Sequence, residues 1–311
     1  MSTQGAVSAP KKPRFGISPG DFMLLLVAAT WGGSYLAVKQ LGEAGSTTAL
    51  MTLRFIPAAI FLWLFWLKNR TRFTKPELVM SLGFGISQVV ILNMEAVSVH
   101  LTSATNGGLI ISLAIILTPI AEGALSRNWL PPRFFLATVV AVIGVALLIV
   151  GNGFVAPNLG DFIMLGAALL RTMHFALAGR FTQGKPVSAL NLTVLQVTVS
   201  AVVMCFFNPG QTIQAALSYS AADWWLILFL SLFCTALGFI GMSWGIKHTS
   251  ASRTSLLLGT EPVFATLIAV WFGGELMGPI GVLGAALIVG ATYWGQAIEA
   301  KHRLTPVLPA S

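Results

Sequence analysis

The chain has 311 residues, of which 56% are hydrophobic and only 9% are charged, and its mean hydropathy is +0.83. So few charges cannot cover the surface of a soluble globule, and the composition therefore places the chain in lipid. The net charge of +8 taken alone would also fit a nucleic-acid-binding protein, so the positions of the charges must decide between the two.

Ten apolar runs follow one another along the chain, and each is about as long as the ~20 residues that a helix needs to cross a bilayer. Charges, proline or clusters of Gly, Asn and Ser close each run. Lipid offers no partner to an unpaired backbone group, and the runs are too long and alternate too little for barrel strands, so helices are predicted. The predicted spans are 22–39, 47–67, 77–97, 104–125, 133–150, 161–179, 187–207, 223–246, 254–272 and 279–298.

Lysine and arginine outside the spans, together with Arg133 at the first position of its span, are confined to every second loop and to the two ends of the chain. These residues are Lys11, Lys12, Arg14, Lys68, Arg70, Arg72, Lys75, Arg127, Arg133, Arg180, Lys185, Lys247, Arg253, Lys301 and Arg303. The other loops have no Lys or Arg, and their only charged residues are acidic ones at or near their edges. The positive-inside rule therefore predicts a multi-pass protein of the bacterial inner (plasma) membrane with both termini in the cytoplasm. The charges are explained by the lipid bilayer, and no nucleic acid is predicted as a partner.

Two short signatures occur twice. Gly20-Asp21-Phe22 opens the first span, and Gly160-Asp161-Phe162 opens the sixth, 140 residues later. Thr102-Ser103-Ala104 precedes the fourth span, and Thr249-Ser250-Ala251 precedes the ninth. Two copies of a five-helix unit are therefore predicted, and because five is an odd number, the second copy must be inverted in the membrane. Inverted repeats are typical of alternating-access carriers, whose site lies near the bilayer midplane between the halves.

The predicted fold is an all-α polytopic membrane protein with ten transmembrane helices in two inverted five-helix repeats. Its predicted parts are a cytoplasmic tail over 1–20, repeats over 21–150 and 155–298, and a cytoplasmic tail over 299–311. The Gly-rich tenth helix either forms a homodimer contact, through helices 5 and 10, or packs against helix 5 of its own chain. Neither a cofactor nor a metal is predicted, because Cys205 and Cys234 stand alone in apolar spans.

Further motifs are spread over nearly the whole chain. They are Ala29-Thr30-Trp31-Gly32-Gly33-Ser34-Tyr35, Arg54-Phe55, the two Thr-Ser-Ala signatures, Glu261-Pro262-Val263-Phe264, and Gly274-Glu275 before the Gly-rich tenth span. Together they resemble the drug/metabolite transporter superfamily, EamA type. The resemblance implies a ten-helix carrier, in most cases an exporter, and specifies no substrate. The chain departs from the family pattern at Arg171, where an aromatic residue matching Trp31 is more usual.

Polar residues inside the spans are the candidates for a binding site, because a charge at the bilayer centre costs about 2.5–3.5 kcal/mol on insertion scales. Arg171 and His174 lie three residues apart on one face of the sixth helix. Arg171 either binds a carboxylate or phosphate of the substrate or forms a structural ion pair with Glu261 or Glu95. Both interpretations stay open at this point.

Other candidates lie on the first three helices. Gln88 and Glu95 are seven residues apart, which predicts one polar face on the third helix. The aromatic residues Trp31 and Tyr35 either stack on a substrate or pack as ordinary helix aromatics. Arg54 faces the bundle or extends to the membrane interface. The predicted substrate-binding set is Arg171, His174, Trp31, Tyr35, Gln88 and Glu95.

Glu261 directly precedes Pro262 in the ninth span. Proline removes a backbone hydrogen bond and frees a carbonyl group for water or substrate. A carboxylate beside such a break indicates a gating or coupling group, and a gate is favoured over a proton carrier. The resemblance implies the same, because this pair is common in the family and therefore fits a general role better than substrate choice.

The functional hypothesis is a secondary carrier, not an enzyme, that exports a small organic metabolite by alternating access. An amino acid or related carboxylate is favoured, because guanidinium groups bind planar anions in two places. One alternative is an exporter of cationic or aromatic drugs, with Glu95 or Glu261 as the counter-charge. Another is a membrane-embedded enzyme, which is disfavoured because the chain has no HExxH motif and no carboxylate pair close in sequence.

Overall fold

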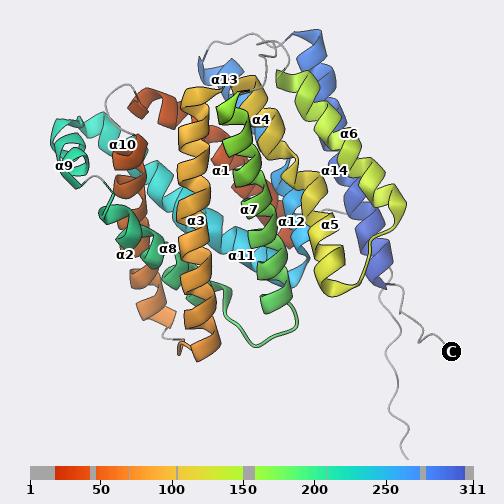
Figure 1. The fold of residues 1–311 in the computed structure, drawn as a ribbon, viewed down its shortest axis with the longest axis horizontal. Coiled ribbons are helices and arrows are strands. Elements are labelled where there is room, and N and C mark those ends of the chain that lie inside the picture. The colour runs from red at the N-terminus through yellow and green to blue at the C-terminus, as the bar shows by residue number, and fades with distance from the viewer. Residues whose placement is uncertain are drawn as a thin grey trace, which may run out of the picture.

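The apolar runs form helices that lie roughly along one direction in the computed structural model of the protein (Figure 1). The structure describes residues 18–42, 47–69, 71–102, 104–149, 158–207, 209–273 and 278–304. The predicted Gly274-Glu275 motif and most of both predicted tails lie outside these residues. A helix pairs its backbone groups within itself, so an apolar run of this length has a stable conformation in lipid.

The elements are named in chain order. They are α1 (Pro19–Gly42), α2 (Thr47–Asn69), α3 (Lys75–Leu101), α4 (Ala104–Ser112), α5 (Ala114–Ser126), α6 (Pro132–Ile149), α7 (Leu159–Thr182), α8 (Ala189–Cys205), α9 (Pro209–Ser218), α10 (Ala221–Phe229), the π-helix η2 (Leu230–Leu237), α11 (Gly238–His248), α12 (Ala251–Leu258), α13 (Glu261–Gly273) and α14 (Pro279–Leu304).

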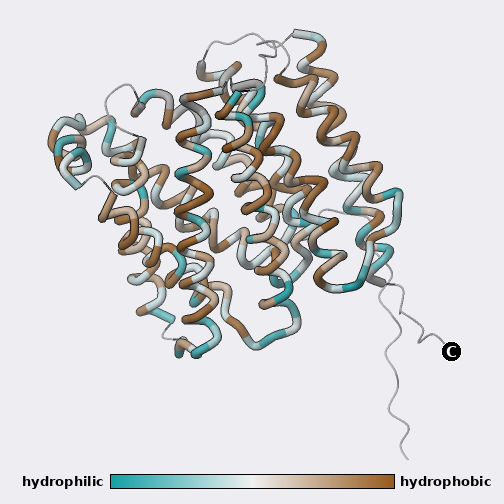
Figure 2. Tube along the Cα trace, in the orientation of Figure 1, coloured by the Kyte–Doolittle hydropathy of each residue, from teal (hydrophilic) through white to brown (hydrophobic). Residues whose placement is uncertain are grey.

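Eight helical stretches in the described part of the chain are long and apolar enough to cross a membrane, or nine if the bent pair α8 and α9 is counted as one span. Large apolar side chains such as Leu64, Val79 and Phe162 stay exposed on outer helix faces, where a bilayer would cover them. In Figure 2, hydrophobic residues line the helices and hydrophilic residues gather at the turns at the lower end of the view. The predicted all-helical membrane fold is thus confirmed at this level.

Three predicted spans contain an interruption. The span 104–125 consists of α4 and α5 with Leu113 between them, and the span 254–272 lies in α12 and α13, which are joined by Gly259 and Thr260. The span 223–246 contains η2. The helix α9 was not predicted, and it follows α8 after a bend of 98°. The second break has a physical cause in the sequence, because Pro262 lacks the N–H that would continue α12 into α13.

The first helix of each half packs mainly against the other half. α1 contacts α11, α12 and α13, and α7 contacts α3, α4 and α5. The apolar core that joins the two halves includes Val27, Phe55, Phe175 and Phe239. Each half therefore contributes a helix to the packing of its partner, and the two halves form one bundle.

The helices α6 and α14 lie side by side along one edge of the bundle (Figure 1). Their backbones approach so closely that a Cβ atom on Gly144 would lie 2.8 Å from the carbonyl oxygen of Gly284. These helices are the predicted helices 5 and 10, so their glycines serve a contact within one chain. A homodimer through these helices would have to use their other faces, and it stays a prediction.

Candidate functional site

A cavity of about 230 Å³ lies between the two halves of the bundle. Its walls come from α1, α4, α5 and α6 of the first half and from α7, α12 and α13 of the second. Most lining side chains are apolar, and the exceptions include Ser112, Arg171, Ser255, Glu261 and Thr266. Pockets for drug-sized ligands typically measure about 300–1,000 Å³, so this cavity suits a smaller molecule.

Two interrupted helices meet at the cavity. α4 ends before Leu113, eleven residues after Thr102, and α12 ends before Gly259 and Thr260, with Thr260 eleven residues after Thr249. The break therefore recurs at the same place in both halves. Residues on both sides of each break line the cavity, namely Ser112 and Ala114 at the first break and Leu258 and Glu261 at the second. Broken helices at membrane depth are tolerated where they line a cavity, and in transporters such breaks hold the substrate or ions.

Arg171 lines the cavity and also forms an ion pair with Glu95 of α3. Both side chains keep part of their surface accessible, 27% for Arg171 and 19% for Glu95. Glu95 is one of the two carboxylates that the sequence offered to Arg171 as an ion-pair partner. The pair does not remove Arg171 from the cavity, so both sequence interpretations describe part of its environment.

Trp31, Glu261 and Pro262 also lie in the cavity wall, and their roles in binding and gating stay predictions. Trp31 comes from α1, and the other two are the first residues of α13. The side chain of Tyr35 lies outside what the structure describes. Arg54 turns into the bundle, where its Nε donates to the hydroxyl of Thr235 over 2.6 Å.

The remaining predicted site residues lie away from the cavity. His174 is buried between α7 and α3, with Nδ1 2.8 Å from the hydroxyl of Ser87 and its ring against Phe84. Gln88 is buried in α3 and is not part of the cavity lining. The predicted shared face of Arg171 and His174 is therefore divided: the first residue points toward the cavity and the second toward the helix packing.

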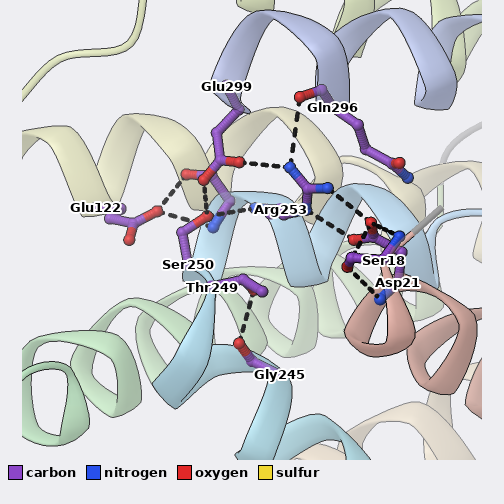
Figure 3. Close-up of polar contacts among 10 residues, drawn as sticks. Ser18, Asp21, Glu122, Gly245, Thr249, Ser250, Arg253, Gln296 and Glu299 are labelled. Atoms are coloured by element: carbon purple, nitrogen blue, oxygen red, sulfur yellow. Dashed lines mark hydrogen bonds and ion pairs between the residues drawn. The ribbon is translucent and has the colours of Figure 1, made fainter. Parts of the chain in front are cut away.

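At the end of the bundle where α1 begins, an arginine of the second half holds a carboxylate of the first. Arg253 donates from Nε and Nη2 to the two oxygens of Asp21, each over 2.8 Å. It also donates from Nη1 to Glu299 over 2.9 Å, and the hydroxyl of Ser250 donates to the same carboxylate over 2.8 Å. Asp21 and Glu299 are each 1% exposed. Figure 3 shows Arg253 between its two carboxylates, and we call these four residues the Arg253 clamp.

Glu122 of α5 makes a second contact between the halves at this end. It accepts hydrogen bonds from the backbone N–H of Ser252 over 2.8 Å and of Ala251 over 3.3 Å, and from the hydroxyl of Ser252 (Figure 3 includes Glu122). The first N–H groups of a helix have no partner within it, and the helix dipole favours an anion there. Glu122 therefore adds to the capping of α12 from the opposite half, beside the N-cap residue Ser250.

The equivalent carboxylate of the second half has neutral partners. Asp161 accepts a hydrogen bond from the hydroxyl of Thr102 and another from Nδ2 of Asn106 over 3.3 Å. Asn106 lies four residues after Thr102, and Arg253 lies four residues after Thr249. An asparagine thus stands at this end where the other end has the arginine.

The contacts of Asp161 and of Glu122 lie at opposite ends of α7. Asp161 is in the first turn of α7, whereas Gln183, which follows its last turn, donates to Ile246 O over 3.1 Å and to Glu122 over 3.4 Å. A helix of 24 residues is about 36 Å long. Arg171 is near the middle of this length, so the cavity lies between the Arg253 end and the Asp161 end.

The sequence does not by itself identify the two end contacts. It does mark their residues, because Asp21, Asp161, Thr102 and Thr249 all belong to the signatures that occur twice. An acidic residue that recurs at the start of an apolar helix in both halves is the signal that points to them. The signal is incomplete, since nothing in the sequence pairs Asp21 with Arg253.

Comparison with known proteins supplies the family. The model of the EamA-like transporter family matches residues 18–150 and 158–294, one match in each half. An uncharacterized transporter of Archaeoglobus fulgidus is 26% identical over 270 residues, which cover 86% of this chain and 83% of the relative. A protein of Streptantibioticus cattleyicolor named as a probable terminal-alkyne amino-acid exporter is 25% identical, with 87% of this chain and 91% of the relative covered.

A solved crystal structure has the same fold, with a TM-score of 0.77 over 90% of this chain and 99% of that chain, at 17% identity. The resemblance first carried by the short motifs is confirmed by the family match, which covers most of the sequence in two copies. The two relatives, which this chain matches over most of their length, are named as a transporter and an exporter. The chain therefore belongs to the EamA-like transporter family.

Proposed function

We propose that the protein is a secondary transporter that exports a small organic metabolite, an amino acid or related carboxylate, by alternating access. The observation that carries this proposal is the cavity between the halves, lined by Arg171 and Glu261 at the point where two broken helices meet. The name of the Streptantibioticus relative, a probable amino-acid exporter, supports the same substrate class.

The proposed architecture is ten transmembrane helices in two inverted repeats. α1 has 24 residues, long enough to cross a bilayer, and it adds one helix to the nine stretches counted by length and composition. α1 begins at the Arg253 end and α7 begins at the Asp161 end, so these equivalent helices run in opposite directions. Opposite directions are what an inverted repeat requires.

In the proposed orientation, the Arg253 end faces the cytoplasm of a bacterial cell. The basic loops support this orientation, because Lys185 and Lys247 belong to the same end as Arg253, and positive residues are enriched on the cytoplasmic side. Both chain termini would then lie in the cytoplasm, and the Asp161 end would face outward.

An amino acid fits the polar groups of the cavity. The guanidinium of Arg171 offers paired N–H donors to a carboxylate, and it can share them between Glu95 and a substrate. The carboxylate of Glu261 is suited to an ammonium group. Trp31 and Phe175 provide apolar surface for a substrate side chain. The cavity thus offers groups of both signs and an apolar wall, which is the pattern of a zwitterionic metabolite.

Alternating access assigns a role to each end. Separation of Asp21 from Arg253 would admit substrate from the cytoplasm, and separation of Asp161 from Thr102 and Asn106 would release it outside. Glu261 and Pro262 lie at the break between α12 and α13 and also line the cavity. A movement of α12 together with the clamp would therefore shift these two residues and change the cavity wall. In this scheme the pair acts as a gate.

The proposal is tested with purified protein in lipid vesicles. Uptake of labelled amino acids and carboxylates is measured with and without a pH gradient, for the native sequence and for Arg171→Gln. We expect transport of at least one compound and a loss of about tenfold or more in the variant, because hydrogen bonds to a charged group contribute about 1.5–3 kcal/mol. Arg180→Gln is the matched control, since Arg180 is on the same helix and donates to Leu125 O away from the cavity.

The two variants separate the possible outcomes. Transport that falls with Arg171→Gln and persists with Arg180→Gln supports the proposed binding site. Equal transport by both variants would remove Arg171 from the site, and no transport of any amino acid or carboxylate by the native sequence would refute the proposed substrate class.

A further inference from the structure

The π-helix η2 interrupts an otherwise α-helical stretch between α10 and α11. π-turns are rare and occur mostly at functional sites. The side chain of Thr235 follows the wider spacing, because its hydroxyl donates over 3.0 Å to Leu230 O, five residues earlier. In the α-helix α8, the hydroxyl of Thr198 donates to Val194 O, four residues earlier. A side-chain bond therefore supports the π conformation of η2.

Arg54 of α2 holds η2 from the side. Its Nε donates to the hydroxyl oxygen of Thr235 over 2.6 Å, and Thr235 is fully buried. Within the described residues, no carboxylate lies within ion-pair distance of Arg54, whereas Arg171 has Glu95. A charged side chain inside a transmembrane helix costs about 2.5 kcal/mol or more on insertion scales. The presence of Arg54 in α2 therefore needs a functional explanation.

Trp31 rests on the residue next to Thr235. Its Nε1 donates to the carbonyl of Cys234 over 2.7 Å, and the thiol of Cys234 donates back to Thr30 O over 3.2 Å. At Gly238, just after η2, a Cβ atom would lie 2.6 Å from Trp31 Nε1. The indole therefore lies directly on the π-helix, and its position depends on the conformation of η2. Because Trp31 lines the cavity, a shift of η2 would change the shape of the cavity.

We propose that Trp31 selects substrates by the size of their side chain, and that Arg54 is a positioning residue that holds η2, and with it the indole of Trp31, in place. The inference rests on the proposed function and goes beyond it by naming what limits the substrate. The chain of contacts runs from Arg54 to Thr235, then to the adjacent Cys234 carbonyl, and from there to Trp31 in the cavity wall.

The first test measures selectivity in lipid vesicles, as the ratio of maximal rate over KM for phenylalanine to that for alanine. We expect Trp31→Ala to raise this ratio about tenfold, because it removes the wall, and Gly238→Ala to lower it about tenfold, because it pushes the indole into the cavity. A role in folding alone would reduce the maximal rates for both substrates and leave the ratio unchanged.

The role of Arg54 is tested with the same ratio. Arg54→Gln and Thr235→Val both remove the hydrogen bond between Arg54 and Thr235, and Thr235→Val also removes the bond to Leu230 O. Each should loosen the indole and raise the ratio, and the double variant should add little to Thr235→Val alone. Thr198→Val is the matched control, because Thr198 accepts a hydrogen bond from Trp63 Nε1 over 2.9 Å in a contact away from the cavity. A ratio that stays constant in Trp31→Ala, Gly238→Ala and Thr235→Val would overturn the inference.

A second test needs no substrate. Cys234 is buried and Cys205 is exposed, so in a Cys205→Ser background the membrane-permeant reagent N-ethylmaleimide reports on the contact between η2 and α1. We expect modification of Cys234 to be about tenfold faster with Thr235→Val, which loses the bond to Arg54, and unchanged with Thr198→Val. Equal modification rates with and without Thr235→Val would overturn the inference. This readout does not depend on transport, so it is separate from the test of the proposed function, which fails if no amino acid or carboxylate is transported.

Discussion

At the Arg253 end the carboxylate at the start of α1 meets an arginine, whereas at the Asp161 end the equivalent carboxylate of α7 meets a threonine and an asparagine. Removal of one partner from a buried ion pair costs about 3–5 kcal/mol. A hydrogen bond to a charged group contributes only about 1.5–3 kcal/mol. The comparison teaches that two copies of one structural unit can close the two ends of a bundle with different chemistry, and the loss of one partner is expected to cost more at the Arg253 end.

This inequality bears on the resting state of the proposed carrier. If each end must open in turn, the end with the weaker contacts opens at the lower cost in free energy. We therefore expect the unloaded protein to stay closed at the Arg253 end for most of the time. Glu122 adds to the difference, because it caps α12 at the same end.

The largest effect is expected from Arg253→Gln, which removes the arginine that pairs with the buried carboxylates of Asp21 and Glu299. The free energy of unfolding should fall by about 3–5 kcal/mol, measured by denaturant unfolding of the solubilised protein. Arg133→Gln, at an exposed position in α6, is the control and should change little. Neutralisation of both carboxylates as well, with Asp21→Asn and Glu299→Gln, should restore most of the loss. A single variant as stable as the control would show that the clamp contributes little.

An intermediate effect is expected from Glu122→Gln. The carboxylate accepts hydrogen bonds from the two backbone N–H groups at the start of α12, and the neutral amide keeps the shape but loses the charge. We expect a loss of about 1–2 kcal/mol in the same unfolding assay, from the weaker bonds and the lost interaction with the helix dipole. Ser126→Ala, in the last turn of the same helix, is the control. An unchanged stability for Glu122→Gln would limit the inequality to the clamp itself.

The smallest effect is expected from Asn106→Ala, which removes one neutral donor from Asp161. The bond from Asn106 is long at 3.3 Å, and Thr102 and the backbone N–H of Asn158 still donate to this carboxylate. The loss should therefore lie below that of an ordinary hydrogen bond to a charged group, at about 0.5–1.5 kcal/mol. The same assay measures it beside Arg253→Gln. A loss as large as that of the arginine variant would remove the difference between the two ends.

Much of the fold follows from the sequence, because the length and apolar character of a run determine whether it crosses a membrane as a helix. The break before Glu261 is marked by Pro262, but nothing in the residues around Leu113 marks the equivalent break in the first half. The helix α9 is short and half polar, so a search for long apolar runs does not find it. Local composition identifies spans, whereas breaks and bends depend on the packing around them.

The candidate site is predictable to a smaller extent. Arg171 and Glu261 stand out because charges inside apolar runs are costly, and both line the cavity. His174 has the same local signal and yet points toward α3, since helix periodicity does not say which face meets which neighbour. The clamp joins Asp21 to Arg253, which is 232 residues later, and each looks like an ordinary charge at the end of a span. Such a pairing appears only in three dimensions.

The most direct test of the central claim measures both ends in one preparation. Spin labels on the exposed positions Ser126 and Lys301 report on the Arg253 end, and labels on Leu101 and Ala222 report on the Asp161 end. In Arg253→Gln, compared with the native sequence, we expect the distance between the labels on Ser126 and Lys301 to lengthen. The distance between the labels on Leu101 and Ala222 should stay the same or shorten. Lengthening at both ends, or at neither, would contradict the account of two ends that open in turn around a central cavity.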